Sequence, residues 1–132
     1  AGTTASDFEF LPVDVNLKRC ERYFERKTAV GASTNYTNFA SGHIQSTSFG
    51  AYCFLLKTIK RANPSFSSSA ASTFQNSNGD TYPAGTSISF SAITTISTQL
   101  ALNSSSGLTL GRGAIIKANG NTTAYIDASS EL

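Results

Sequence analysis

Hydrophobic and polar residues alternate along short segments of this chain, most regularly near the C-terminus. There Ala124, Ile126 and Ala128 alternate with Tyr125 and Asp127. Alternation with a period of two is typical of strands that bury one face. Similar segments recur roughly every 8 to 12 residues in the second half, a spacing typical of β-sandwiches and jelly rolls. The strands predicted in this half cover residues 66–74, 86–96, 99–102, 108–110, 114–118 and 123–128.

Turn-forming residues separate these segments. Residues 119–121 read Asn-Gly-Asn, which predicts a hairpin turn between the last two strands. The pattern as a whole predicts an all-β protein: a jelly-roll-like antiparallel β-sandwich with one short helix near the N-terminus.

The most apolar part of the chain is residues 44–62, centred on residues 49–59. A continuous apolar run of this kind predicts a central strand that is buried on both faces. Basic residues mark the point where this strand should reach the surface, and they are Lys57, Lys60 and Arg61. The preceding residues, 28–43, are rich in turn formers and predict a long loop or a weak hairpin.

The N-terminal part contains the helix signal. Residues 1–7 predict an extended lead-in, and residues 8–10 alternate as a strand would. After Pro12, Asp14 is the expected N-cap of one or two helical turns that reach Cys20. Residues 21–27 then alternate again, and a strand there would present charges to oppositely charged residues of a neighbouring strand.

Composition narrows the class of protein. The chain of 132 residues has 20 Ser and 16 Thr, only 14% charged residues, and a net charge of +2. Its length fits a single domain over residues 1–132. A balance so close to neutral does not indicate a nucleic-acid partner, and no apolar run is long enough for membrane insertion. Processing, trimming or origin as the C-terminal part of a longer protein would each explain a start at Ala1 without Met.

The two cysteines, Cys20 and Cys53, each lie among apolar neighbours. We expect free, buried thiols that act as small hydrophobic residues, and a single disulfide is the alternative.

Residues for catalysis or metal binding are scarce. His43 is the only histidine, with no carboxylate near it in the sequence to orient it, so neither a catalytic triad nor a zinc site is indicated. Asp80 lies in a turn sequence, and Asp127 and Glu131 lie near the C-terminus, where they would solvate an edge strand. We therefore predict no enzymatic activity, no metal and no cofactor.

Three aromatic residues in segments that resemble loops are candidates for ligand binding: Tyr36, Phe39 and Tyr82. Exposed aromatic rings flanked by Asn, Ser and Thr suit a sugar-binding surface, because the ring faces the sugar and amides bind its hydroxyls. The alternative is that these rings cover the ends of the core.

Residues 8–26 resemble a motif from C-terminal domains of bacteriophage and cyanophage tail-fibre and other virion-surface proteins, F-E-x-R-P-x-x-x-E-L-x-L-C-Q-R-Y-Y-E. The matching residues are Phe8, Glu9, Pro12, Leu17, Cys20, Arg22, Tyr23 and Glu25. Leu11, Glu21 and Phe24 depart from it. The apolar segment 54–64 and an ending with Tyr125-Ile126-Asp127 and Glu131-Leu132 are also similar to that family.

The resemblance implies a jelly-roll-like β-sandwich on the virion surface, at the tail or the capsid exterior and extracellular when released. It also implies a homo-oligomer, commonly a trimer, in contact with other virion proteins. The resemblance carries over no binding site. For a domain in this setting we expect non-covalent attachment to host cell-surface glycans. The alternatives are a purely structural cement or decoration protein and an enzyme such as a glycan depolymerase.

Overall fold

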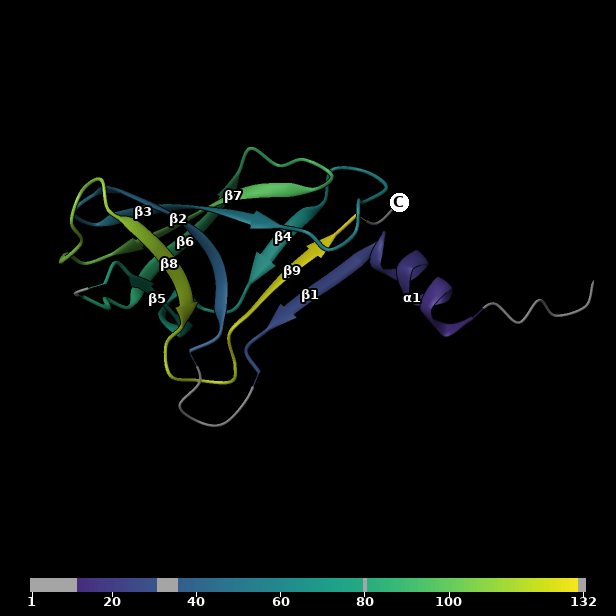
Figure 1. Cartoon of the computed structure of the whole chain (residues 1–132), viewed down its shortest axis with the longest axis horizontal. Coiled ribbons are helices and arrows are strands. Elements are labelled where there is room, and N and C mark those ends of the chain that lie inside the picture. The colour runs from purple at the N-terminus through teal and green to yellow at the C-terminus, as the bar shows by residue number, and fades with distance from the viewer. Residues whose placement is uncertain (1–11, 31–35, 80, 131–132) are drawn as a thin grey trace, which may run out of the picture.

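The computed structural model describes residues 12–30, 36–79 and 81–130 (Figure 1). The predicted lead-in 1–7 and strand 8–10 lie outside these residues. The described part contains one α-helix, one short 3-10 helix and nine strands: α1 (Val13–Glu21), β1 (Phe24–Thr28), β2 (Asn38–Ser46), β3 (Phe49–Leu55), β4 (Ser65–Ser68), η1 (Ala71–Thr73), β5 (Phe74–Ser77), β6 (Gly85–Ser91), β7 (Ser97–Ser104), β8 (Gly113–Ala118) and β9 (Tyr125–Ser129).

The strands form two antiparallel sheets that pack face to face (Figure 1). The small sheet has the order β1-β9-β4, and the large sheet has the order β5-β8-β2-β3-β7-β6. This confirms the predicted all-β antiparallel sandwich with one short helix near the N-terminus. Within the described residues, no helix combines the length and the apolar character that crossing a membrane requires.

The core lies between the two sheets and consists of the inward-facing residues of both. Ile126 and Ala128 of β9 are almost fully buried, as predicted, but Asp127 between them is also buried, at 8% exposed. Strand β9 is the central strand of the small sheet, so the prediction that Asp127 solvates an edge strand is wrong. From the large sheet, Phe39 and Phe74 meet edge to face, with ring centroids 5.1 Å apart. Phe54 meets Phe66 of the small sheet in the same geometry at 6.2 Å. Such pairs add to the stabilisation that comes from burying the rings themselves.

Strand β3 occupies the centre of the large sheet, between β2 and β7, as the apolar segment predicted. The predicted burial on both faces is wrong, because Cys53 and Leu55 point to the outer face and are exposed. The strand also ends at Leu55, earlier than expected, and the basic residue Lys60 is buried rather than at the surface.

The two edges of the large sheet approach each other. An isolated bridge joins Gln75 of β5 to Ala84, the residue that precedes β6. The backbone N–H of Asn76 also donates to the carbonyl of Pro83 at 3.0 Å. The sheet therefore curls until its edge strands meet at this seam.

Two connections differ from the prediction. Residues 119–121 do not close a hairpin, since β8 pairs with β2 and β5 whereas β9 pairs with β1 and β4. The turn instead carries the chain from one sheet to the other. The predicted strand 66–74 divides in the same way into β4 of the small sheet and β5 of the large one, and residues 108–110 are not a strand.

The N-cap of helix α1 lies two residues earlier than predicted. The Pro12 carbonyl accepts hydrogen bonds from Val15 and Asn16, so Pro12 is the N-cap and Asp14 lies inside the first turn. The helix projects from the sandwich and none of its residues is buried (Figure 1). Both thiols are free, but Cys20 on this helix and Cys53 on β3 are exposed, which corrects the prediction of buried thiols.

Strand β1 takes part in two ion pairs, of which the one with β9 is a cross-strand pair as predicted from the sequence. Arg26 of β1 and Asp127 of β9 form a two-point ion pair, with Nε–Oδ1 and Nη2–Oδ2 distances of 2.6 Å. On the opposite face of β1, Glu25 accepts from the Lys60 ammonium at 2.9 Å. Lys60 also donates to the carbonyl of Glu21, the last residue of α1, so one buried lysine joins the helix end to the sandwich.

Candidate functional site

Sheet register brings two of the three candidate aromatic residues to one lysine. Lys117 of β8 lies opposite Asn38 of β2 on one side and Gln75 of β5 on the other. Tyr36 comes two residues before Asn38, and Tyr82 comes two residues before Ala84, which bridges Gln75. Because side chains two residues apart in an extended chain share a face, both rings come to the outer face beside Lys117.

The Lys117 ammonium lies between the two rings. Its Nζ is 4.6 Å from the ring centroid of Tyr82 and 5.4 Å from that of Tyr36, within the range of cation–π attraction. Both rings remain half open to solvent, with 55% of Tyr36 and 53% of Tyr82 exposed. Together with Gln75 these residues line a groove of about 300 Å³, called the tyrosine–lysine groove below.

The segment that carries Tyr82 is held by short-range hydrogen bonds. The side-chain oxygen of Asn78 accepts from the backbone N–H of Thr81 at 3.1 Å and from its hydroxyl at 2.9 Å. The Tyr82 hydroxyl donates to the Gly79 carbonyl at 3.3 Å. These bonds and the seam of the large sheet fix the position of the Tyr82 ring, so less ordering entropy would be lost when a ligand binds.

Gln75 supplies an amide at the floor of the groove. It is only 4% exposed and lies under the outer-face side chains of its neighbours on β8 and at the seam. A side-chain amide offers two donor hydrogens and an acceptor oxygen, which is the set that sugar hydroxyls can pair with. The groove therefore combines two aromatic faces, one positive charge and one neutral amide.

Phe39 does not belong to this site, and its prediction as a binding residue is wrong. Its ring is 4% exposed and packs on Phe74 in the core. Strand β2 begins at Asn38, so alternation turns Phe39 inward while Asn38 faces solvent. The Lys27 ammonium lies 5.7 Å from the centre of its ring, and partial burial there lowers the pKa of Lys27. The alternative interpretation, a ring that closes the core, is correct for Phe39.

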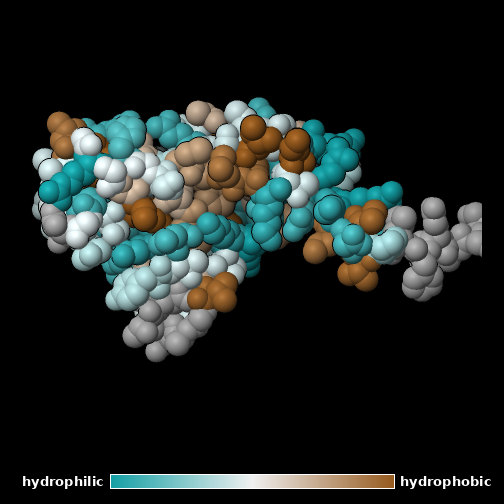
Figure 2. All heavy atoms as spheres, in the orientation of Figure 1, coloured by the Kyte–Doolittle hydropathy of each residue, from teal (hydrophilic) through white to brown (hydrophobic). Residues whose placement is uncertain are grey.

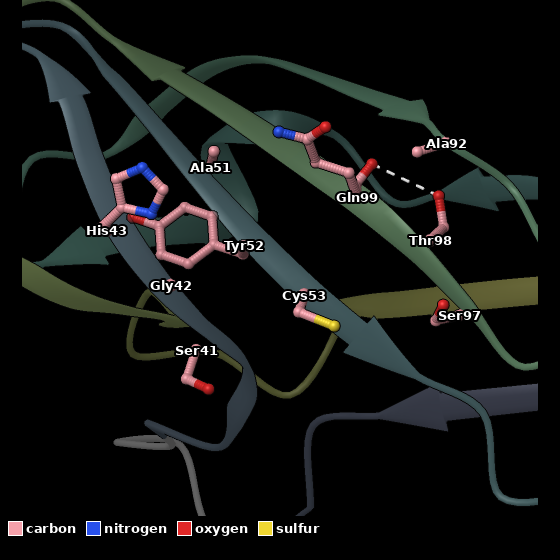
Figure 3. A pocket seen from close by; sticks show the side chains of 10 residues that line it. All are labelled: Ser41, Gly42, His43, Ala51, Tyr52, Cys53, Ala92, Ser97, Thr98 and Gln99. Atoms are coloured by element: carbon pink, nitrogen blue, oxygen red, sulfur yellow. Dashed lines mark hydrogen bonds between the residues drawn. The ribbon is translucent and has the colours of Figure 1, made fainter.

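A second hollow of about 310 Å³ lies on the outer face of the large sheet (Figure 3). Figure 3 shows the side chains of His43, Cys53 and Gln99 on three neighbouring strands, among small residues. His43 is exposed, and its ring nitrogen lies 3.4 Å from the side-chain nitrogen of Gln45. Among the described residues, no lysine, arginine or carboxylate side chain and no exposed tyrosine or phenylalanine ring lines this hollow, so it offers a ligand less than the tyrosine–lysine groove does.

Sequence reasoning missed Lys117 and Gln75. The strand that contains Lys117 was predicted over residues 114–118 and occurs over Gly113–Ala118. Along this strand Lys117 points to one face, and the buried residues Ile116 and Ala118 point to the other. The error lay in the pairing, because the expected hairpin put the wrong strand beside it. Gln75 directly follows the predicted strand 66–74, and no strand pairing was predicted for it.

Comparison with protein-family models, with curated proteins and with solved structures found no match for this chain. The functional proposal below therefore rests on the sequence and on the geometry of the groove.

Proposed function

We propose that this chain is a non-enzymatic attachment domain of a phage virion surface, and that it binds host-surface glycans through the tyrosine–lysine groove. The observation behind the binding role is the pair of half-exposed rings of Tyr36 and Tyr82 on either side of Lys117. Aromatic faces cover the apolar face of a sugar ring, and a few polar groups then fix its orientation. The virion setting rests on the resemblance of residues 8–26 to the tail-fibre motif.

The proposed domain acts as a homo-oligomer, with a trimer expected from the same resemblance. A groove with so few contacts would bind one sugar weakly. Several copies that engage one cell surface gain avidity without any new contact, because the later binding events become intramolecular. Sedimentation equilibrium of the whole chain tests this, and a monomer at micromolar concentration would contradict it.

The experiment on the binding role uses an array of immobilised bacterial surface polysaccharides and the fluorescently labelled chain. We expect saturable binding to at least one polysaccharide and its loss in Tyr36→Ala/Tyr82→Ala. Tyr23→Ala is the matched control, since Tyr23 is also exposed but lies beside α1, far from the groove in the sequence and in the fold. Binding that survives in the double variant would contradict the site.

A structural role in the particle is the second candidate, and one observation favours it. Figure 2 shows hydrophobic side chains on the outside of α1, where Val13 is 84% exposed and Leu17 is 57% exposed. Apolar side chains on a projecting helix suit contact with another virion protein. No binding to any polysaccharide by the folded oligomer would favour this role over glycan attachment.

A further inference from the structure

Among the residues that the structure describes, Lys117 is the only charged side chain that lines the tyrosine–lysine groove. The described residues contain two ion pairs, Arg26–Asp127 and Lys60–Glu25, and Lys117 takes part in neither. The described carboxylates lie on α1, β1 and β9, and none of them lines the groove. The groove therefore presents a positive charge that no described carboxylate neutralises.

The two tyrosine rings orient this charge without cancelling it. Their π-faces attract the ammonium, which fixes Nζ over the rings, but they carry no net charge. An ammonium has three donor hydrogens, and a cation–π contact does not replace a charged acceptor. An anionic group on the ligand would form the shorter and stronger charge-assisted hydrogen bond.

Gln75 lines the groove with a neutral side-chain amide. The residue as a whole is 4% exposed, but its amide is not among the buried side-chain groups without a partner, which in the described part of the chain are Asn78 Nδ2 and Ser104 Oγ. An amide that lines a groove can donate to and accept from the hydroxyl groups of a ligand. Lys117 lies directly opposite Gln75 in the β5–β8 register, which places the charge and the amide side by side.

The chemistry favours a carboxylate over a phosphate or a sulfate. The groove offers one lysine and a neutral amide, which match a single negative charge. Tight binding of phosphate groups typically relies on the planar fork of arginine or on several donors that converge, and no arginine lines this groove. The flanking rings require a flat, weakly polar face on the same ligand, as a sugar ring provides.

We propose that the tyrosine–lysine groove recognises an acidic sugar, a hexuronic acid unit of a polysaccharide. Its carboxylate binds Lys117 Nζ, its ring lies against a tyrosine face, and a hydroxyl pairs with the Gln75 amide. This inference rests on the proposed glycan-binding function and adds the class of sugar to it.

The test uses ligands that differ only in the charge of interest. The whole chain is titrated calorimetrically with oligosaccharides of galacturonic, glucuronic and mannuronic acid, and with the methyl ester of each. We expect at least one acid form to bind about tenfold or more tightly than its ester, because the ester loses the charge-assisted hydrogen bond. The preference should weaken at high salt, since an exposed charge pair is screened.

Two lysine variants locate the effect. Lys117→Gln should reduce the preference for the acid to about twofold or less, because a neutral amide cannot make the charged bond. Lys57→Gln, which removes an exposed lysine at the other end of the sandwich, should leave the preference intact. A thermal unfolding midpoint close to that of the wild type shows that each variant is folded.

Other outcomes separate the two proposals. In one such outcome, the wild type binds the acid and the ester with equal affinity, and Tyr36→Ala/Tyr82→Ala binds neither. That result would overturn the proposed preference for an acidic sugar and leave the glycan-binding function in place. Tighter binding of a sulfated oligosaccharide than of the carboxylated ones would also overturn the carboxylate. Binding of no saccharide, acidic or neutral, would overturn both.

Discussion

Tyr52 of β3 donates its phenolic hydrogen to the side-chain oxygen of Asn76 of β5, although strands β8 and β2 lie between β3 and β5 in the large sheet. Both side chains are buried, with exposed fractions of 1% and 0%. The amide nitrogen of Asn76 lies 3.4 Å from the Leu102 carbonyl of β7. The bond is possible because the large sheet curls, and it links the centre of the sheet to its edge from inside.

Removing the Tyr52 hydroxyl should destabilise the fold. Tyr52→Phe leaves the Asn76 oxygen buried without its donor, which should lower the free energy of unfolding by about 1 to 3 kcal/mol in urea titrations followed by circular dichroism. Tyr23→Phe, at an exposed tyrosine, should change it by less than about 0.5 kcal/mol. If Tyr52→Phe/Asn76→Leu were as unstable as the sum of the two single variants, the proposed coupling between these residues would be refuted.

Stability should also fall in alkaline solution through the same hydroxyl. Burial raises the pKa of Tyr52 above the value of 10.0 for an exposed tyrosine. As pH rises past about 10, the unfolded chain loses this proton while the folded chain keeps it, so the unfolded state binds fewer protons and the free energy of unfolding decreases. The stabilisation that comes from keeping the Tyr52 hydroxyl protonated in the folded chain is fully present below about pH 9. Urea titrations from pH 8 to 11 should show a steeper decline for the wild type than for Tyr52→Phe, and parallel curves would contradict the prediction.

The central strand offers a neighbouring pair for testing the core. Phe54 is 2% exposed and packs on Phe66, whereas Leu55 beside it is 70% exposed. Phe54→Ala should cost about 3 to 5 kcal/mol of unfolding free energy through lost burial and the cavity it leaves. Leu55→Ala should cost less than about 0.5 kcal/mol. Similar costs for both, measured by urea unfolding, would be inconsistent with the assigned faces of β3.

The buried ion pair should be sensitive to the loss of one charge. The side chain of Lys60 is 0% exposed and that of Glu25 is 10% exposed. Glu25→Gln leaves the ammonium buried without its carboxylate, which should cost about 3 to 5 kcal/mol. Glu25→Gln/Lys60→Met removes both charges and should recover part of that loss. A double variant less stable than Glu25→Gln would show that Lys60 acts mainly through the Glu21 carbonyl.

Local patterns in the sequence predicted much of this fold. The alternation in β9, the apolar run of β3 and the β8 segment follow from side-chain periodicity, which depends only on neighbours along the chain. The pairing of strands depends on which edges meet across the whole sheet, and residues 119–121 show how a turn sequence can mislead. Their Asn-Gly-Asn run suits a tight turn, yet nothing local to it shows that the next strand belongs to the other sheet.

The candidate site was predictable only in part for the same reason. Tyr36 and Tyr82 could be proposed because exposed aromatic residues in polar segments are unusual. Their meeting over Lys117 depends on two strand registers and on the seam between β5 and the residue before β6. Phe39 was misjudged because the start of β2 lies within a turn-rich segment, and a shift of one residue exchanges the two faces.

The buried Lys60 and the direction of β1 have a mechanical consequence. Helix α1 leads into the N-terminal end of β1 through a bend (Figure 1), and β1 pairs with β9 through five consecutive residues. A pull between α1 and the tyrosine–lysine groove, whose Tyr36 follows the other end of β1 in the chain, would act along this strand. Tension on the helix would therefore shear all of these pairings together instead of unzipping them one by one. Forced unfolding depends on the rate of crossing that barrier. A chain tethered at α1 and bound at the far groove should thus withstand pulling better than its equilibrium stability alone suggests.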